Sequence, residues 1–203
     1  MNMYHIQVKI YDAPPINRAE ILRYAGFSKK ETQDFSAIEE CIKEISQKLS
    51  YKVCYKTVEI KARGDELELE FIKTKSKSLK KRLYGCKRAV VFVATVGIEI
   101  DRLIAKYSVT SPAKALLFQA IGAERVESLA DAFVQDLSKE GLFLTERFSP
   151  GYGDLPIECQ AEIIPSLDSS RKIGVSLNES LLMSPSKSIS AIIGVLDNEN
   201  KNN

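Results

Sequence analysis

The residues best able to do chemistry gather in one short stretch, where Arg147 is followed by two glycines and a tyrosine. A guanidinium is a planar fork that matches a carboxylate. Gly151 and Gly153 lack a Cβ and allow a backbone to approach closely, while Tyr152 offers a flat face and a hydroxyl. Each also has an ordinary alternative, either a surface ion pair or a turn with a packed aromatic. The stretch is therefore a candidate binding site.

Metal ligands are sparse in the sequence. The cysteines are scattered without a C-x-x-C pair, and His5 is the only histidine. This composition predicts neither a zinc site nor an iron–sulfur site. The cysteines are expected to be buried or half-buried free thiols in a reducing compartment, and they are Cys41, Cys54, Cys86 and Cys159.

A basic run is the second feature of note, because no acidic residue occurs between Phe71 and Ile98. The run is either a solvated face or a docking surface for an acidic partner. No helix-turn-helix, RNA-binding aromatic pattern or zinc finger accompanies it, so we expect no nucleic-acid partner. Its members are Lys73, Lys75, Lys77, Lys80, Lys81, Arg82, Lys87 and Arg88.

The first half of the chain must fold around these features, and its pattern predicts helices and strands in alternation. Asn17 and Glu20 form a capping box for a helix that ends at Gly26. The remaining predictions are strands at 5–10, 53–60, 67–72 and 89–94, a helix over 31–49 and a turn at 63–65. A tight turn at 95–97 could present backbone N–H groups to a ligand or simply join strand to helix.

The second half begins with the strongest helix, which Ser111 and Pro112 open and which runs towards Gly141. A Gly- and Pro-rich segment follows at 147–156, then strands at 172–177 and 188–196 and a polar, frayed tail at 197–203. Without repeats or a clear linker, residues 1–203 are predicted to be one α+β domain with long helices packed on a sheet. The helix seam consists of Leu117, Ile121, Val126, Leu129, Phe133 and Leu137.

Residues 147–152 form an R-x-x-x-G-Y motif, followed downstream by Asn178-Glu179-Ser180, then by Met183-Ser184-Pro185 and serines at alternate positions. Together with Leu129-Ala130-Asp131-Ala132-Phe133, they resemble the activation domain of cobalamin-dependent methionine synthase. That family carries R-x-x-x-G-Y, T-E-S, M-x-P and S-x-S at similar spacing after an L-A-E-A-F helix. The resemblance covers residues 111–190 well and residues 1–110 more loosely.

The resemblance implies a mainly antiparallel sheet and a cleft that binds S-adenosylmethionine. In that cleft Arg147 would hold the ligand carboxylate, and Asp131 would take the ammonium or favour the sulfonium. The protein would supply binding and orientation, because the sulfonium is already activated. The full set of implied ligand-binding residues is Arg147, Ser149, Gly151, Tyr152, Gly153, Asp131, Glu179 and Ser180.

The implied function is the reactivation of a methionine synthase that lacks its own activation domain. The partner would carry the cobalamin, and a flavodoxin-like donor could supply the electron that reductive methylation of cob(II)alamin needs. Two departures, the shorter Asp131 and the missing C-terminal tyrosine of full-length members, leave two alternatives open. One is a module for another corrinoid methyltransferase, and the other is a non-catalytic S-adenosylmethionine sensor.

Composition limits the remaining classes of function. The 203 residues are 44% hydrophobic with a net charge of +2, which suits a globular domain with a real core. No apolar run approaches the roughly 20 residues that cross a bilayer, and the N-terminus lacks a signal-peptide core. We therefore expect a cytoplasmic protein without a membrane partner.

Overall fold

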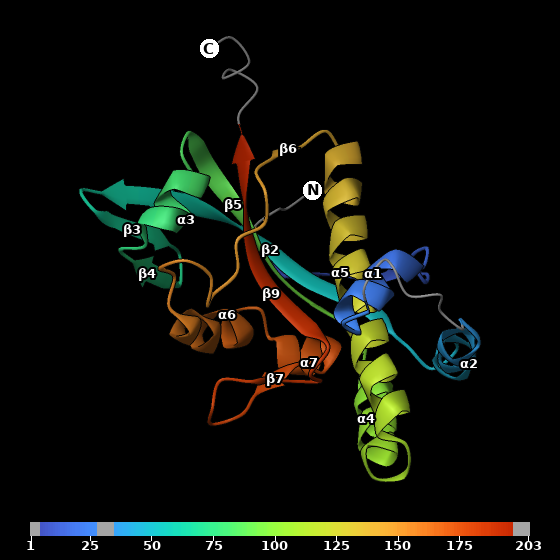
Figure 1. The fold of residues 1–203 in the computed structure, drawn as a ribbon. Helices are drawn as coiled ribbons and strands as arrows, with labels where there is room; N and C mark the ends of the chain where they lie inside the picture. The colour runs from blue at the N-terminus through green and yellow to red at the C-terminus, as the bar shows by residue number, and fades with distance from the viewer. Residues whose placement is uncertain (1–4, 28–34, 197–203) are drawn as a thin grey trace.

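The computed structural model describes residues 5–27 and 35–196, and its centre is an antiparallel sheet of seven strands (Figure 1). The order is β4-β3-β2-β5-β9-β6, and β1 pairs with the first half of β2. The long strands β2, β5 and β9 are rich in β-branched residues, which suit a buried sheet. The strands are β1 (Gln7–Tyr11), β2 (Tyr51–Arg63), β3 (Glu66–Leu69), β4 (Ile72–Thr74), β5 (Cys86–Thr95), β6 (Phe143–Leu144) and β9 (Ser188–Leu196), and a separate hairpin joins β7 (Ser176–Leu177) to β8 (Met183–Ser184).

Helices cover both faces of the sheet and bury a separate apolar cluster on each. The larger cluster lies under α1, α2, α4 and α5, and the smaller one involves α3, α6 and α7 (Figure 1). The helices are α1 (Arg18–Tyr24), α2 (Ser36–Ile45), α3 (Lys77–Arg82), α4 (Glu99–Thr110), α5 (Pro112–Lys139), α6 (Gln160–Ser166) and α7 (Ser169–Ile173), with a 3-10 turn at Ile157–Cys159.

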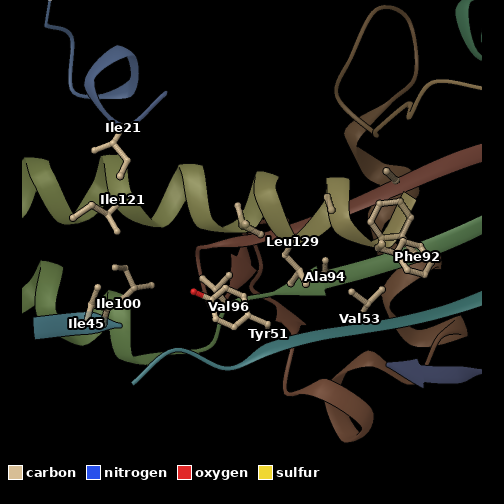
Figure 2. Packing of buried hydrophobic residues seen from close by; sticks show 14 of the residues in the cluster. Ile21, Ile45, Tyr51, Val53, Phe92, Ala94, Val96, Ile100, Ile121 and Leu129 are labelled. Carbon is tan, nitrogen blue, oxygen red and sulfur yellow. The ribbon is translucent and has the colours of Figure 1, made fainter. Parts of the chain in front are cut away.

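The long helix α5 organises the larger cluster. Figure 2 shows Ile21 of α1 approaching α5 from one side, while Phe92 and Ala94 of β5 lie on the sheet side. Every residue of the predicted apolar seam is buried, which confirms that prediction. Pro112 occupies the first turn as expected, but Ser111 makes no side-chain hydrogen bond to the helix.

The antiparallel α+β architecture with long helices confirms the predicted fold class. The strands at 5–10, 89–94 and 188–196, the helix ended by Gly26 and the turn at 63–65 are also found, with boundaries shifted by a few residues at some ends. Of the predicted helix at 31–49, the described part forms only over α2. The predicted tail at 197–203 and the start of that helix lie outside the described residues.

Three local predictions were wrong. The strand at 67–72 is two strands, because Glu70 adopts a left-handed conformation and the chain reverses at Phe71. The strand at 172–177 forms only at its end, as β7, because Lys172 and Ile173 belong to helix α7 and Gly174 ends that helix with a φ of 76°. The capping box is half formed: Asn17 Oδ1 accepts from the Glu20 N–H at 3.3 Å, but the Asn17 N–H donates to Glu124.

All four cysteines are buried and none forms a disulfide, as the sequence predicted. Burial raises the pKa of the Cys54 thiol, which disfavours a reactive thiolate. Over residues 5–27 and 35–196, no group of three potential metal ligands comes together. No helix in the same ranges is long and apolar enough to span a membrane.

Candidate functional site

The motif segment is held against the edge of the sheet. Phe148 and Ile192 of β9 exchange two backbone hydrogen bonds, each at 2.9 Å. The Thr145 N–H donates to the Gly194 carbonyl at 3.0 Å, and the Gly194 N–H donates to the Thr145 hydroxyl at 2.9 Å. Phe148 packs against the smaller core, and adjacent side chains of an extended chain point to opposite faces. Arg147 therefore points to the other face, towards α5.

Arg147 meets two carboxylates of α5 on that face. Its Nη2 donates to Asp131 Oδ1 at 2.7 Å and lies 3.1 Å from Glu127 Oε2. The two acids are four residues apart, so they share one face of the helix. The Arg147 side chain is 25% exposed, whereas Glu127 and Asp131 are 43% and 63% exposed. The cluster is accessible to a ligand.

A cleft of about 610 Å³ opens around this cluster. That volume lies within the range of small-molecule sites, roughly 300 to 1,000 Å³. A second hollow, of about 620 Å³, lies between α5 and the segment before α1, and Asp131 and Gln135 line both. The first cleft is lined by Arg82, Glu127, Asp131, Val134, Gln135, Thr145, Glu146, Arg147, Phe148, Ser149, Tyr152 and Ile189.

The cleft brings together four of the eight predicted site residues, Asp131, Arg147, Ser149 and Tyr152. Tyr152 is 68% exposed, so its ring offers an open face to a ligand. Glu179 and Ser180 lie outside the cleft lining, in the turn between β7 and β8. There the backbone N–H of Ser180 donates to the Asn178 side chain at 2.9 Å.

Both glycines of the motif have positive φ, 88° at Gly151 and 56° at Gly153, which favours glycine. Neither is among the residues that line the cleft. A Cβ on Gly151 would lie 3.1 Å from Ile157, and one on Gly153 would lie 2.9 Å from the Ser78 hydroxyl. The close approach that these glycines permit is thus to the protein's own side chains.

Asp154 fixes the end of the motif segment to α3. Its carboxylate accepts hydrogen bonds from the Ser76 hydroxyl and from the N–H groups of Lys77, at 2.7 Å, and Ser78, at 3.1 Å. The hydrogen bond from Ser76, together with those two N–H groups, holds the pKa of Asp154 well below its usual range. The motif that forms the cleft is therefore attached to the helix of the basic run.

Sequence reasoning missed several residues of the cleft. Glu127 precedes Asp131 by one helical turn, and this spacing could have revealed it. Arg82 and Glu146 form an ion pair at the edge of the cleft, and they come from segments 64 residues apart. No local signal could have predicted that pair.

The turn at 95–97 uses its N–H groups internally. Val96 donates to the Lys187 carbonyl at 3.2 Å, and Gly97 donates to the Thr95 hydroxyl at 3.2 Å. This geometry favours the alternative that the turn simply joins β5 to α4.

Comparison with known proteins identifies the fold. Neither a family model nor a curated protein matches the chain by sequence. Among solved structures, the MetH reactivation domain bound to AdoHcy (S-adenosylhomocysteine) matches with a TM-score of 0.70 and 15% identity. The match covers 95% of this chain and 79% of that one. The chain therefore has the fold of the MetH reactivation domain.

Proposed function

We propose that this chain binds S-adenosylmethionine in the Arg147 cleft and acts in trans to reactivate a cobalamin-dependent methionine synthase that lacks its own activation domain. The observation that carries the proposal is the fold of a reactivation domain bound to AdoHcy, combined with an open cleft built from the R-x-x-x-G-Y segment. The chain would contribute one component of the reaction, with no complete activity of its own.

The cleft residues fit the chemistry of this ligand. S-Adenosylmethionine carries a carboxylate, an ammonium, a sulfonium and an aromatic base. The cleft offers the Arg147 guanidinium for the first, and Asp131 with Glu127 for the cations. Tyr152 and Ile189 supply aromatic and apolar surface for the adenosine. Each group of the ligand thus has a complementary group in the cleft.

The proposed task is to orient a methyl donor towards a cobalt centre that the partner carries. Reductive methylation of cob(II)alamin consumes one electron and the methyl group of the sulfonium, and yields methylcobalamin and S-adenosylhomocysteine. A flavodoxin-like protein is the proposed electron donor. The chain's own contribution is binding and orientation, which can supply a large part of a rate enhancement without an acid, base or nucleophile.

Calorimetric titration of S-adenosylmethionine and S-adenosylhomocysteine into the protein tests this proposal, with Arg147→Ala and Arg147→Lys as variants. A guanidinium that holds a carboxylate in a partly closed cleft contributes on the order of 2 to 3 kcal/mol. Arg147→Ala should therefore weaken binding by roughly 30-fold to 150-fold. Arg147→Lys keeps the charge but loses the fork, so part of the defect should remain.

Decarboxylated S-adenosylmethionine is the control ligand, since it lacks the group that Arg147 would hold. An equal loss for this analogue would show that Arg147 supports the fold or contacts another group. Absence of heat and of thermal stabilisation with either natural ligand at millimolar concentration would contradict the whole proposal. Binding without any effect on a synthase fragment that lacks its activation domain would favour another corrinoid partner or a sensor.

A further inference from the structure

The nitrogen that Arg147 offers to the cleft is already in use. A guanidinium presents two edges with parallel N–H groups, one made of Nε and Nη2 and the other of Nη1 and Nη2. Both edges include Nη2, which already donates to Asp131 at 2.7 Å and lies 3.1 Å from Glu127. One Nη2 hydrogen is donated to Asp131, and the Glu127 carboxylate lies close enough to the same nitrogen to hinder the approach of a third carboxylate. A ligand carboxylate can bind bidentately only if one of the two acids moves away.

Asp131 is the acid with room to move. It is 63% exposed and lines both hollows, so open space lies on either side of its carboxylate. Glu127 is 43% exposed and lines only the first cleft. With Glu127 still beside Nη2, the guanidinium would keep its position after Asp131 has left. The two acids therefore have different tasks towards the same arginine.

We propose that the Asp131–Arg147 ion pair is an exchangeable contact that selects ligands with both an α-carboxylate and an α-ammonium. The ligand carboxylate replaces Asp131 on Arg147, the released Asp131 carboxylate accepts the ligand ammonium, and Glu127 positions Arg147 throughout. This inference rests on the proposed function, because it concerns the amino-acid end of the same ligand.

Charge balance explains the selectivity. A zwitterionic ligand replaces one ion pair with two, and no charged group is left without a partner. A ligand with only the carboxylate would release Asp131 without offering it a cation, and would place a third negative charge near Glu127. A ligand with only the ammonium would have to draw Asp131 away from Arg147. The carboxylate-only ligand thus exchanges one ion pair for another and leaves Asp131 to water, and the ammonium-only ligand leaves Arg147 with Glu127 alone, so neither gains the second ion pair that the zwitterion forms.

Three ligands and three variants distinguish the exchange of Asp131 from the positioning of Arg147 by Glu127. The ligands are S-adenosylhomocysteine, its deaminated analogue, which keeps the carboxylate, and methylthioadenosine, which lacks the whole amino-acid end. Asp131→Asn removes the exchangeable acid, and Glu127→Gln removes the positioning acid. Glu162→Gln is the matched control, because it deletes the same charge from α6, which packs on the smaller core. Calorimetry gives the affinities, and thermal unfolding confirms that each variant is folded.

Asp131→Asn should change the two carboxylate ligands in opposite directions. S-Adenosylhomocysteine should bind about 10-fold more weakly, since its ammonium loses its partner, at about 1.4 kcal/mol per decade. The deaminated analogue should bind Asp131→Asn about 3-fold to 10-fold more tightly than it binds the wild type, since Asp131 then no longer competes for Arg147. If Asp131 only contacts the ammonium, the deaminated analogue should bind Asp131→Asn and the wild type with equal affinity. That result would overturn the proposal.

Glu127→Gln should weaken both carboxylate ligands by a similar factor, about 5-fold, and leave methylthioadenosine unchanged. An equal loss for methylthioadenosine would show that Glu127 shapes the cleft and does not position Arg147. Glu162→Gln should change none of the three affinities. If the wild type binds none of the ligands, the proposed function itself fails; if it binds them but the reversal is absent, only the exchange fails.

Discussion

Helix α5 contributes carboxylates to two clusters with arginine within two turns, and the clusters differ in burial. Glu124 and Arg125 are each 2% exposed, and they pair with one another inside the protein. Glu127 and Asp131 lie on the open side and pair with Arg147, with exposures between 25% and 63%. Carboxylate–arginine pairs built on one helix are thus placed in two different environments, and in the second the arginine comes from the motif segment.

The buried cluster has a fixed acceptor for each of its donors. Arg125 donates to the Pro14 and Pro15 carbonyls, at 2.6 and 2.8 Å, as well as to Glu124. Glu124 in turn accepts from the Asn17 N–H at 2.9 Å. Burial tends to lower the pKa of Arg125, but the hydrogen bonds and charge of Glu124 together with Tyr51 outweigh it, so the pKa is raised and Arg125 stays charged. The cluster fixes the segment before α1 onto α5.

The role of an ion pair thus depends on how deeply it is buried and on whether its groups would keep hydrogen-bond partners if they separated. Partners in the buried cluster cannot be exchanged, because a group that leaves would remain desolvated and unpaired. Partners in the open cluster can turn to water or to a ligand at little cost. We therefore propose a structural role for the Glu124–Arg125 cluster and a role in ligand exchange for the cluster around Arg147.

The largest expected effect comes from Arg125→Ala compared with Arg147→Ala. Arg125→Ala leaves Glu124 and two carbonyls without their donor in the interior, and should lower the free energy of unfolding by about 3 to 5 kcal/mol. Arg147→Ala removes a partly exposed pair and should lower it by about 1 kcal/mol or less. Urea unfolding of both variants at neutral pH measures the contrast.

Equal destabilisation by these two substitutions would remove the distinction between the clusters. Arg125→Lys is the informative intermediate, since it keeps the charge but cannot serve Glu124 and both carbonyls at once. Its stability should lie between those of the wild type and Arg125→Ala.

Asp154 provides a smaller effect that sharpens the comparison, because it is exposed yet bound by three donors. Its pKa is depressed on folding, so the unfolded chain binds more protons and stability rises with pH. This contribution is complete above the unfolded pKa of about 3.9 and is lost as pH falls towards the lower folded value. Asp154→Asn should therefore be less stable than the wild type at pH 7, and the difference should shrink below about pH 4.

Unfolding in urea across a pH series tests this dependence. Glu162→Gln is the control, because Glu162 has no hydrogen bond or ion pair within the part of the chain that the structure describes. The Asp154→Asn variant should also bind S-adenosylhomocysteine a few-fold more weakly, since its motif segment is no longer fixed to α3. A difference in stability from wild type that stays constant from pH 7 to pH 2 would contradict the linkage.

The sequence predicted the elements whose own pattern determines them. The seam of α5 follows helical periodicity, and β5 is continuously apolar from Ala89 to Ala94, so both were predicted from local signals. Residues 67–72 and 172–177 misled the prediction, because a left-handed Glu70 and the αL Gly174 interrupt apolar patterns that otherwise suit strands. Helix α3 was missed because its lysines show no apolar face beyond Leu79.

Four of the predicted site residues line one cleft, but the sequence did not predict which of them contact one another. The motif and the helix match identified Arg147 and Asp131, but their direct contact depends on how β9 places the motif segment against α5. The same holds for the basic run, which lacks acids in its own sequence. Folding brings Asp65, Glu68 and Glu146 to three of its members. Such long-range partners cannot be read from spacing along the chain.

The smallest expected effect concerns the exposed charges on α3, which extend the comparison to residues outside both clusters. Lys81 is exposed, lines a hollow next to the cleft, and has no ion pair among residues 5–27 and 35–196. The Lys80 ammonium donates to the Gly64 carbonyl and makes no ion pair with the residues that the structure describes. Lys73 and Lys75, by contrast, already pair with Glu68 and Asp65. The unpaired lysines should therefore dominate any attraction of an acidic partner.

Charge reversal at both positions, Lys80→Glu with Lys81→Glu, should slow the reactivation of a synthase fragment by about 3-fold to 10-fold at low salt. The effect should vanish near 1 M salt, where the screening length is about 3 Å, and ligand affinity should not change. Lys73→Glu with Lys75→Glu is the matched control and should act more weakly, because those charges are already partly neutralised by their acidic partners. Equal slowing at low and high ionic strength would show that the lysines make specific contacts or support α3. Equal slowing by both pairs at low salt would instead mean that net charge matters, and not its position beside the cleft.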